Sequence, residues 1–182
     1  MKQALLIVDV QNDYFADGSM ALVGMDQDAT NCAELLNHFR KQHRPIFHMQ
    51  HIATREGATF FVPNTKGCEI NESVVPFDGE PVIVKHFPNA FRDTSLNQLL
   101  KEDSIEEVVI CGAMTHMCID TTTRAAFDLG YTCHVVSDAC ATRDLEFNGH
   151  LVRAADVQAT FMAALQAPFA QIWSAEKYIR AH

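Results

Sequence analysis

Ala4-Leu5-Leu6-Ile7-Val8, followed at once by Asp9, is the stretch of this sequence that decides its fold. The run is continuously apolar, which is typical of a strand buried on both faces of a parallel sheet. It is too short for the core of a signal peptide or for a membrane span. We therefore expect a parallel sheet that includes this strand and carries Asp9 at the strand's carboxyl end.

Further apolar segments alternate with helical patterns along the chain. We expect additional strands at residues 45–49, 81–85, 107–112, 131–136 and 170–173. We expect helices at residues 26–43, after an N-cap at Thr94, at 115–129, and at 144–165 with Asp144 as the cap. This alternation predicts an α/β fold, a three-layer α-β-α sandwich around a mostly parallel sheet of about six strands. No repeat or linker interrupts it, so residues 1–182 are expected to form a single domain.

Composition narrows the classes of partner. The formal net charge of −9 and the pI near 5.4 argue against nucleic acid or an anionic membrane, because phosphate recognition needs a basic surface. Hydrophobic residues make up 48% of the chain, enough for a core without disulfides or metals. Six cysteines without a C-x-x-C pair or an export signal predict reduced thiols in a cytoplasmic protein.

Three polar residues follow strands in this pattern. Asp9 ends the first strand, Lys85 ends the third, and Gly112 leads from the fourth strand into a helix whose first turn carries Cys118. Ligands of parallel sheets bind beyond the carboxyl ends of the strands, so we expect the three side chains to converge there.

The three groups make a coherent catalytic set. A helix N-terminus and the charge of Lys85 would favour the Cys118 thiolate. Asp9 would take the thiol proton and return it to a leaving nitrogen. Taken singly, each residue has a structural alternative: Cys118 as a core residue, Lys85 as a solvated strand end, and Asp9 as the cap of the next turn.

Four segments, in order, resemble the isochorismatase-like cysteine hydrolase superfamily over about residues 4–140. Leu5–Phe15 is similar to its hydrophobic-D-x-Q-x-x-F opening, and Lys85 with Phe91 to its K-x-x-x-x-x-F segment. Gly112–Ile119 is similar to its G-x-x-T-x-x-C-V nucleophile segment, and residues 124–139 continue in the same order.

This resemblance implies a six-stranded sheet and Asp9, Lys85 and Cys118 as the triad, with a covalent acyl intermediate on Cys118. It also implies a cis peptide bond between Ala113 and Met114 that aims the backbone N–H groups of Met114 and Cys118 at the oxyanion. Relatives of this kind often form dimers or larger assemblies, so a homo-oligomer is expected.

Nicotinamidases of the same superfamily bind a divalent metal near the second strand. His48 and His51 lie there, but residues three apart on a strand point to opposite faces and make a poor chelate. We expect these histidines at a pocket rim or on the surface, and no metal or other cofactor. His86 and His116 neighbour the triad residues in sequence and are left outside it.

The resulting hypothesis is a metal-independent cysteine hydrolase that cleaves a C–N bond of a small molecule. The alternatives are vinyl-ether hydrolysis of the isochorismatase type with Asp9 as the acid, and a non-catalytic binding protein that retains the fold. Residues 52–79 form a long irregular stretch, which is typical of a binding loop or lid. The residues expected to shape an apolar substrate pocket are Phe15, Phe60, Phe61 and Phe91.

Overall fold

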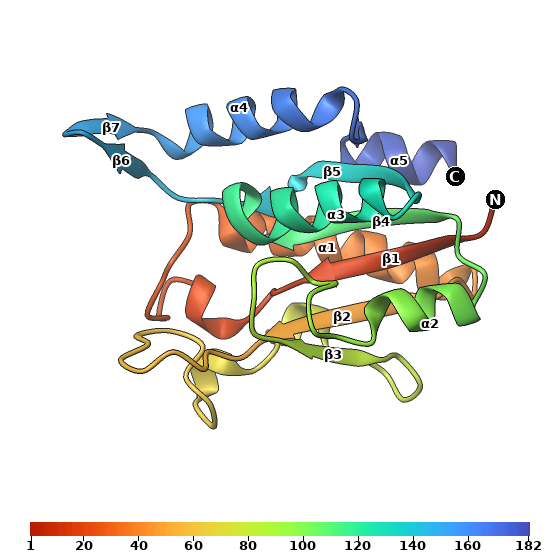
Figure 1. Ribbon diagram of the computed structural model, residues 1–182, viewed down its shortest axis with the longest axis horizontal. Coiled ribbons are helices and arrows are strands. Elements are labelled where there is room, and N and C mark those ends of the chain that lie inside the picture. Colours follow the sequence, from red (N-terminus) through yellow and green to blue (C-terminus); the bar gives the residue numbers. More distant parts are fainter.

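The computed structural model describes residues 1–182 and contains a six-stranded parallel sheet (Figure 1). Every neighbouring pair of strands runs parallel, in the order β3-β2-β1-β4-β5-β8. The strands are β1 (Gln3–Val8), β2 (Ile46–His51), β3 (Val82–Lys85), β4 (Glu107–Ala113), β5 (Thr132–Ala141) and β8 (Gln171–Trp173). The predicted three-layer fold is confirmed.

Helices cover both faces of the sheet, and each face has its own hydrophobic core. The first core contains residues of α1 (Met25–Lys41) and α5 (Ala175–Ala181). The second contains residues of α2 (Leu96–Glu102), α3 (Asp120–Asp128) and α4 (Ala154–Gln166). None of the helices combines the length and the apolar character that crossing a membrane would require.

Strand β1 shows why its apolar run does not alternate. Leu5 and Ile7 pack into the first core, whereas Leu6 and Val8 pack into the second. All six residues of the strand are buried. A buried leucine or isoleucine contributes about 1.5–3 kcal/mol relative to an exposed one, so the central strand stabilises both layers at once.

The order of the strands places a crevice at the end of β1. From β1 the sheet extends through β2 to β3, and then the chain returns to add β4 on the other side of β1. Connections at such a reversal leave opposite faces of the sheet, which opens a ligand-binding crevice beyond the carboxyl ends. Asp9 directly follows β1, and the segment with Cys118 directly follows β4.

Gly112 allows β1 and β4 to approach each other next to this crevice. Its φ is +120°, in the range that favours glycine. A Cβ at this position would lie only 2.0 Å from the carbonyl oxygen of Val8. Any other residue would therefore push the two strands apart.

The prediction of a helix at residues 144–165 is wrong about where the helix begins. A β-hairpin comes first, made of β6 (Leu145–Phe147) and β7 (His150–Val152), and α4 starts at Ala154. Asn148 and Gly149 both have positive φ, the conformation that a two-residue hairpin turn requires. Asp144 still contacts the helix, because its Oδ1 accepts a hydrogen bond from the N–H of Ala154 at 2.8 Å.

Three smaller differences concern other elements. The N-cap of α2 is Ser95, although the Thr94 hydroxyl accepts a hydrogen bond from the N–H of Leu96. Strand β5 continues to Ala141, beyond the expected end at residue 136. The helix expected at 115–129 begins with a π-helical turn, Thr115–Ile119, before α3.

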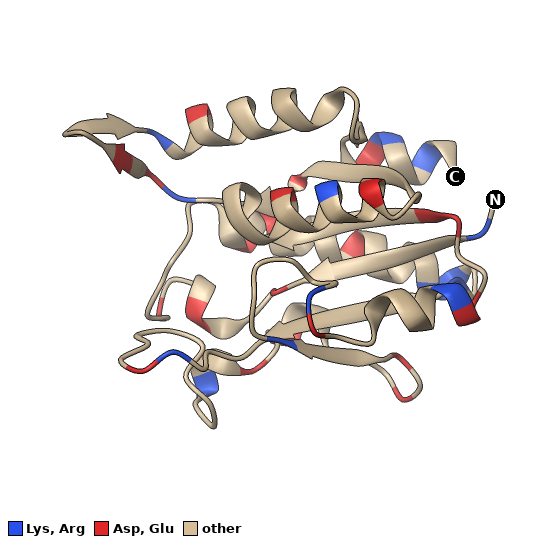
Figure 2. Ribbon diagram, in the orientation of Figure 1, with Lys and Arg blue, Asp and Glu red and all other residues tan.

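The long segment between β2 and β3 contains two short 3₁₀ turns, Lys66–Cys68 and Glu72–Val74. Another 3₁₀ turn, Asn12–Tyr14, follows β1. Lysines and arginines are spread among acidic residues and do not form a continuous stripe along one element (Figure 2).

Candidate active site

The structure brings Asp9, Lys85 and Cys118 together from three separate segments. Lys85 Nζ lies 2.7 Å from Asp9 Oδ2 and 3.3 Å from Cys118 Sγ. Asp9 and Lys85 are completely buried, and Cys118 is 5% exposed. Apart from Lys85 and Cys118, no group of the chain is a hydrogen-bond or ion-pair partner of the Asp9 carboxylate, which therefore faces the thiol directly.

The backbone of Asp9 has an unusual conformation. Its φ is +52°, in the left-handed region that non-glycine residues seldom adopt. The N–H of Asp9 donates to the carbonyl of Met49, and the carbonyl of Asp9 accepts from the N–H of Gln11. Such conformations persist where the surroundings impose them, and they are concentrated at functional sites.

Gln11 joins the end of β2 to the segment after β1. Its Oε1 accepts a hydrogen bond from the N–H of His51 at 2.8 Å, and its Nε2 donates to the His51 carbonyl at 2.9 Å. The same Nε2 donates to the carbonyl of Cys68 at 2.7 Å. The buried amide of Gln11 therefore fixes the main chain of His51 beside the triad.

Asp13 holds the two loops that surround this region. Its carboxylate accepts hydrogen bonds from the N–H of Ser19 at 3.1 Å and from the N–H of Phe61 at 2.6 Å. Gly67 packs directly on the same carboxylate, since a Cβ there would lie 2.2 Å from Asp13 Oδ1. One side chain thus connects the segment after β1 with the segment between β2 and β3.

The electrostatics of the site differ in one respect from the expected thiolate. Burial raises the pKa of Cys118, and the negative charge of Asp9 raises it further, whereas Lys85 lowers it only in part. Burial opposes the charge on Lys85, but Asp9 and Cys118 outweigh it and raise the pKa of Lys85. The expectation of a resting thiolate is therefore wrong: the free site favours a thiol beside an ammonium–carboxylate pair.

His51 is a fourth member of the cluster that the sequence interpretation missed. It is the register partner of Lys85 on the neighbouring strand, and its Nδ1 lies 3.0 Å from Lys85 Nζ. Burial lowers the pKa of His51 to about 4, which keeps the ring neutral. The expected strand ended at Met49, so no pattern placed residue 51 at a strand end.

His48 and His51 do diverge, as their spacing predicted. His48 Nε2 contacts Glu80 Oε2 at 3.0 Å, whereas His51 Nδ1 contacts Lys85 Nζ. The expectation that both lie at a rim or on the surface is wrong for His48, which is 1% exposed. His86 and His116 bond to the carbonyl of Ile52 and the hydroxyl of Thr142, respectively.

Asp9, His51 and Cys118 offer ligand atoms that all lie within 4.8 Å of one another. These donor types suit zinc. However, Lys85 Nζ lies within 3.3 Å of an atom of each of them, so its positive charge occupies the space where a cation would have to sit. The donor set therefore does not fit a metal while Lys85 is charged.

The segment before Cys118 contains the cis peptide bond between Ala113 and Met114 that the family resemblance implied. The carbonyl of Met114 accepts hydrogen bonds from the N–H groups of Met117 and Ile119. The N–H of Met114 itself donates to no group of the chain. It is therefore free to bind a ligand atom near Cys118.

The four phenylalanines expected in one pocket lie in different places. Phe61 is buried against Tyr14 and His51, with ring centroids 4.6 and 5.7 Å away, and Phe60 packs on Phe61. Phe91 instead stacks on Tyr131, at the opposite end of β5 from the triad. Phe15 lines a cavity of about 810 Å³ that contains none of the other three phenylalanines.

Tyr14 is the aromatic residue after β1 that lies near the triad. Burial raises the pKa of its phenol, and the charges of Cys118 and Asp9 add to the effect. The D-x-Q-x-x-F spacing counted from Asp9 ends at position 14, so the motif itself indicated this residue in place of Phe15.

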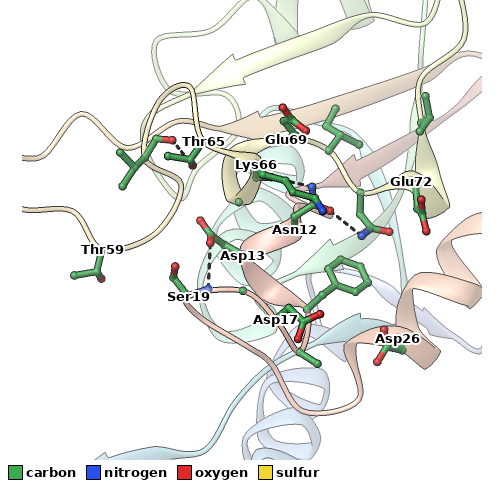
Figure 3. A pocket seen from close by; sticks show the side chains of 18 residues that line it. Asn12, Asp13, Asp17, Ser19, Asp26, Thr59, Thr65, Lys66, Glu69 and Glu72 are labelled. Carbon is green, nitrogen blue, oxygen red and sulfur yellow. Dashed lines mark hydrogen bonds between the residues drawn. The ribbon is translucent and has the colours of Figure 1, made fainter.

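The cavity of about 810 Å³ is lined by Asn12 and Asp13, which follow Asp9 in the chain, but not by Asp9, Lys85 or Cys118. It is lined by residues of the segment after β1 and by much of the long segment between β2 and β3. Figure 3 shows several carboxylates around it, with Lys66 as the labelled base. The expected binding loop thus borders a cavity, together with the segment after β1.

Comparison with known proteins gives a consistent family assignment. A family model described as Isochorismatase domain matches residues 3–176. The uncharacterized isochorismatase family protein YddQ of Bacillus subtilis is 49% identical over 180 residues, which cover 99% of this chain and 100% of that protein. A crystal structure of an isochorismatase hydrolase from Oleispira antarctica is 49% identical, with a TM-score of 0.95, and the match covers 98% of this chain and 96% of that one.

More distant relatives carry names of enzymes. Streptothricin hydrolase of Streptomyces noursei is 32% identical over 171 residues, which cover 93% of this chain but only 58% of that protein. Nicotinamidase of Escherichia coli is 24% identical over 176 residues, which cover 76% of this chain and 82% of that enzyme.

Proposed function

The chain belongs to the isochorismatase family and is a hydrolase, and from this premise we propose that it cleaves the C–N bond of a small amide-like molecule through Cys118, without a metal. The observation that carries the proposal is the position of Lys85 Nζ, within 3.3 Å of both Asp9 and Cys118. This contact joins a base, a cation and a nucleophile in one buried cluster. The similarity to a nicotinamidase supports the choice of amide-like substrates.

In the first half-reaction, Asp9 takes the proton from Cys118 as Sγ attacks the carbonyl carbon of the substrate. The ammonium of Lys85 stabilises the negative sulfur, which burial otherwise disfavours. The backbone N–H groups of Met114 and Cys118 bind the oxyanion. Asp9 then passes its proton to the leaving nitrogen, the C–N bond breaks, and a thioester remains on Cys118.

In the second half-reaction, water attacks the thioester carbon while Asp9 accepts one of the water protons. The C–S bond breaks, and that proton returns to Sγ, which restores the thiol. The acid is released, and Lys85 remains an ammonium throughout, which agrees with the direction of its pKa shift.

This mechanism is tested with a panel of candidate substrates. The panel contains small amides, among them nicotinamide, and isochorismate. We expect Cys118→Ala to lower kcat/KM for a turned-over amide by about 10³-fold or more. Cys133→Ala, at a buried thiol remote from the triad, is the matched control and keeps its activity. Acid quenching during turnover, followed by intact mass measurement, should show the acyl adduct on the wild-type chain.

The outcome separates the alternatives. Cleavage of isochorismate that persists in Cys118→Ala but is lost in Asp9→Asn would replace the covalent mechanism with acid-catalysed ether hydrolysis. If no compound of the panel is turned over and no adduct forms on Cys118, a binding protein that retains the fold would be favoured.

We further propose that the protein forms a homo-oligomer through the β6–β7 hairpin. The hairpin extends away from the sandwich (Figure 1), and its Phe147 and Leu151 side chains are 72% and 53% exposed. An isolated hairpin is only marginally stable, so contact with a second copy would stabilise it. Light scattering should give a multiple of the monomer mass, and Phe147→Ser with Leu151→Ser should reduce it, whereas the exposed control Val75→Ser should not. A monomeric wild-type chain would contradict this proposal.

The six cysteines are unpaired, which favours a reducing compartment, and we propose the cytoplasm.

A further inference from the structure

Lys85 Nζ has more hydrogen-bond acceptors than it has hydrogens. Four acceptor atoms surround it: Asp9 Oδ2 at 2.7 Å, His51 Nδ1 at 3.0 Å, the Phe87 carbonyl at 3.1 Å and Cys118 Sγ at 3.3 Å. An ammonium group supplies only three N–H donors. One of the four acceptors must therefore share a hydrogen or go without one.

The contact between Lys85 and His51 also defines the tautomer of the imidazole. An ammonium has no lone pair, so Nδ1 of His51 must be the acceptor and the ring hydrogen must be on Nε2. The low pKa of His51, about 4, agrees with a ring that remains neutral. The neutral ring is therefore a standing acceptor for Lys85.

The weakest of the four acceptors is the sulfur. Asp9 is charged and nearest, and the Phe87 carbonyl is a strong backbone acceptor, so these two retain their hydrogens. A thiol sulfur accepts only weakly, whereas an imidazole nitrogen accepts well. The third hydrogen therefore goes to His51 while Cys118 is a thiol, and it turns to Sγ only when the sulfur becomes negative.

We propose that His51 is a positioning residue for Cys118, which accepts the third Lys85 hydrogen in the free enzyme and so withholds it from the sulfur. The nucleophile then remains a thiol until substrate engages the site. His51 thus acts through Lys85 and needs no contact with the reacting atoms. This inference rests on the proposed function only in naming Cys118 as the nucleophile.

The ionisable groups in and around this cluster come from several segments, and Asp13, in the 3₁₀ turn after β1, is one of them. Asp9 follows β1, Tyr14 lies in the 3₁₀ turn after it, Lys85 and His51 come from β3 and β2, and Arg143 follows β5. His86 acts on His51 by its charge, but the His86 ring is exposed and bonded to the Ile52 carbonyl. Among the side chains, only His51 competes with Cys118 for a hydrogen of Lys85 as a neutral acceptor.

Alkylation of Cys118 by iodoacetamide, measured against pH by peptide mass spectrometry, tests the proposal in the complete chain. His51→Leu removes the acceptor, which frees the third hydrogen for the sulfur. We expect the midpoint of the alkylation profile to fall by about one pH unit relative to the wild-type chain. At a pH below both midpoints, the variant should therefore be labelled about ten-fold faster than the wild type. His51→Asn places an amide oxygen close to the position of Nδ1 and should keep the wild-type profile.

His51→Phe keeps a ring without an acceptor and should behave like His51→Leu, which provides a second variant if the first folds poorly. Continued protection of Cys133 from labelling shows that each variant is folded. An unchanged midpoint in both apolar variants would overturn the proposal. Equal shifts in His51→Asn and His51→Leu would also overturn it, because the loss of packing would then be the cause. The assay needs no substrate, so its result is independent of whether any tested amide is turned over.

Discussion

Lys85 carries a charge in a position without solvent exposure, and its stability there depends on Asp9. The two groups are 2.7 Å apart, and both are completely buried. Removing one partner of such a pair leaves an uncompensated buried charge. We expect Lys85→Met to lower the free energy of unfolding by about 3–5 kcal/mol, measured by urea denaturation at pH 7.

The double variant Lys85→Met with Asp9→Asn removes both charges and provides the control. It should recover a substantial part of the lost stability while remaining inactive, because the base and the cation are both gone. A double variant no more stable than Lys85→Met would show that the charge pair is not the cause.

Gly112 permits a comparison between two glycines with positive φ. At Gly112 a Cβ would meet the Val8 carbonyl at 2.0 Å, whereas at Gly57, with φ +73°, nothing lies within 4 Å. We expect Gly57→Ala to cost about 1–2 kcal/mol, from backbone conformation alone. Gly112→Ala should cost clearly more, since β1 and β4 must also separate, and thermal unfolding of the two variants checks the order.

Among the elements, the two loops held by Asp13 depend on a single side chain. The Ser19 and Phe61 amides both donate to its carboxylate. We expect Asp13→Ala to increase hydrogen exchange at these two amides by at least about ten-fold, since hydrogen bonds to charged groups contribute about 1.5–3 kcal/mol each. Asp17→Ala, at an exposed residue that lines the same cavity, should leave both amides unchanged.

Much of the element order could be predicted from the sequence, because buried parallel strands leave a continuous apolar signature, as at β1. The β6–β7 hairpin could have been predicted as well, since Asn148-Gly149 is a strong turn signal that the helical interpretation overlooked. The position of His51 beside Lys85 could not be predicted from the sequence. It depends on the register that pairs His51 with Lys85 across two strands, and polar strand ends give no apolar pattern.

The same limit applied to the chemistry of the site. The residue types at positions 9, 85 and 118 indicated a convergent cluster, and the strand-end rule predicted where it would form. The direction of the Cys118 pKa shift could not be predicted from residue types, because it depends on how completely the sulfur is buried.

For the whole molecule, the folded state should lose stability in mild acid. Burial, as the main cause, lowers the pKa of the five histidines His38, His48, His51, His116 and His134. Below the ordinary histidine pKa, near 6.5, the unfolded chain therefore binds more protons than the folded one. Stability should fall as the pH drops from about 6.5 toward 4, and it should be insensitive to these groups above that range.

Glu80 contributes in a lower range of pH. Burial alone would raise its pKa, but the hydrogen bonds from Arg40 and Phe77 lower it to about 2. Its stabilising effect is therefore complete above about 4.5 and is lost only below that value. Urea midpoints between pH 7 and 5 should thus report the histidines, with a smaller decline in His48→Gln than in His43→Asn, an exposed position.

The central place of β1 also has a consequence for biosynthesis. One edge of β1 can pair with β2 soon after both leave the ribosome, but the other edge waits for β4, roughly 100 residues later. At ordinary translation speeds this interval lasts roughly 5–20 s. During it the nascent chain exposes an unpaired apolar strand, so we expect higher recovery of active protein at lower expression temperatures or with added chaperones.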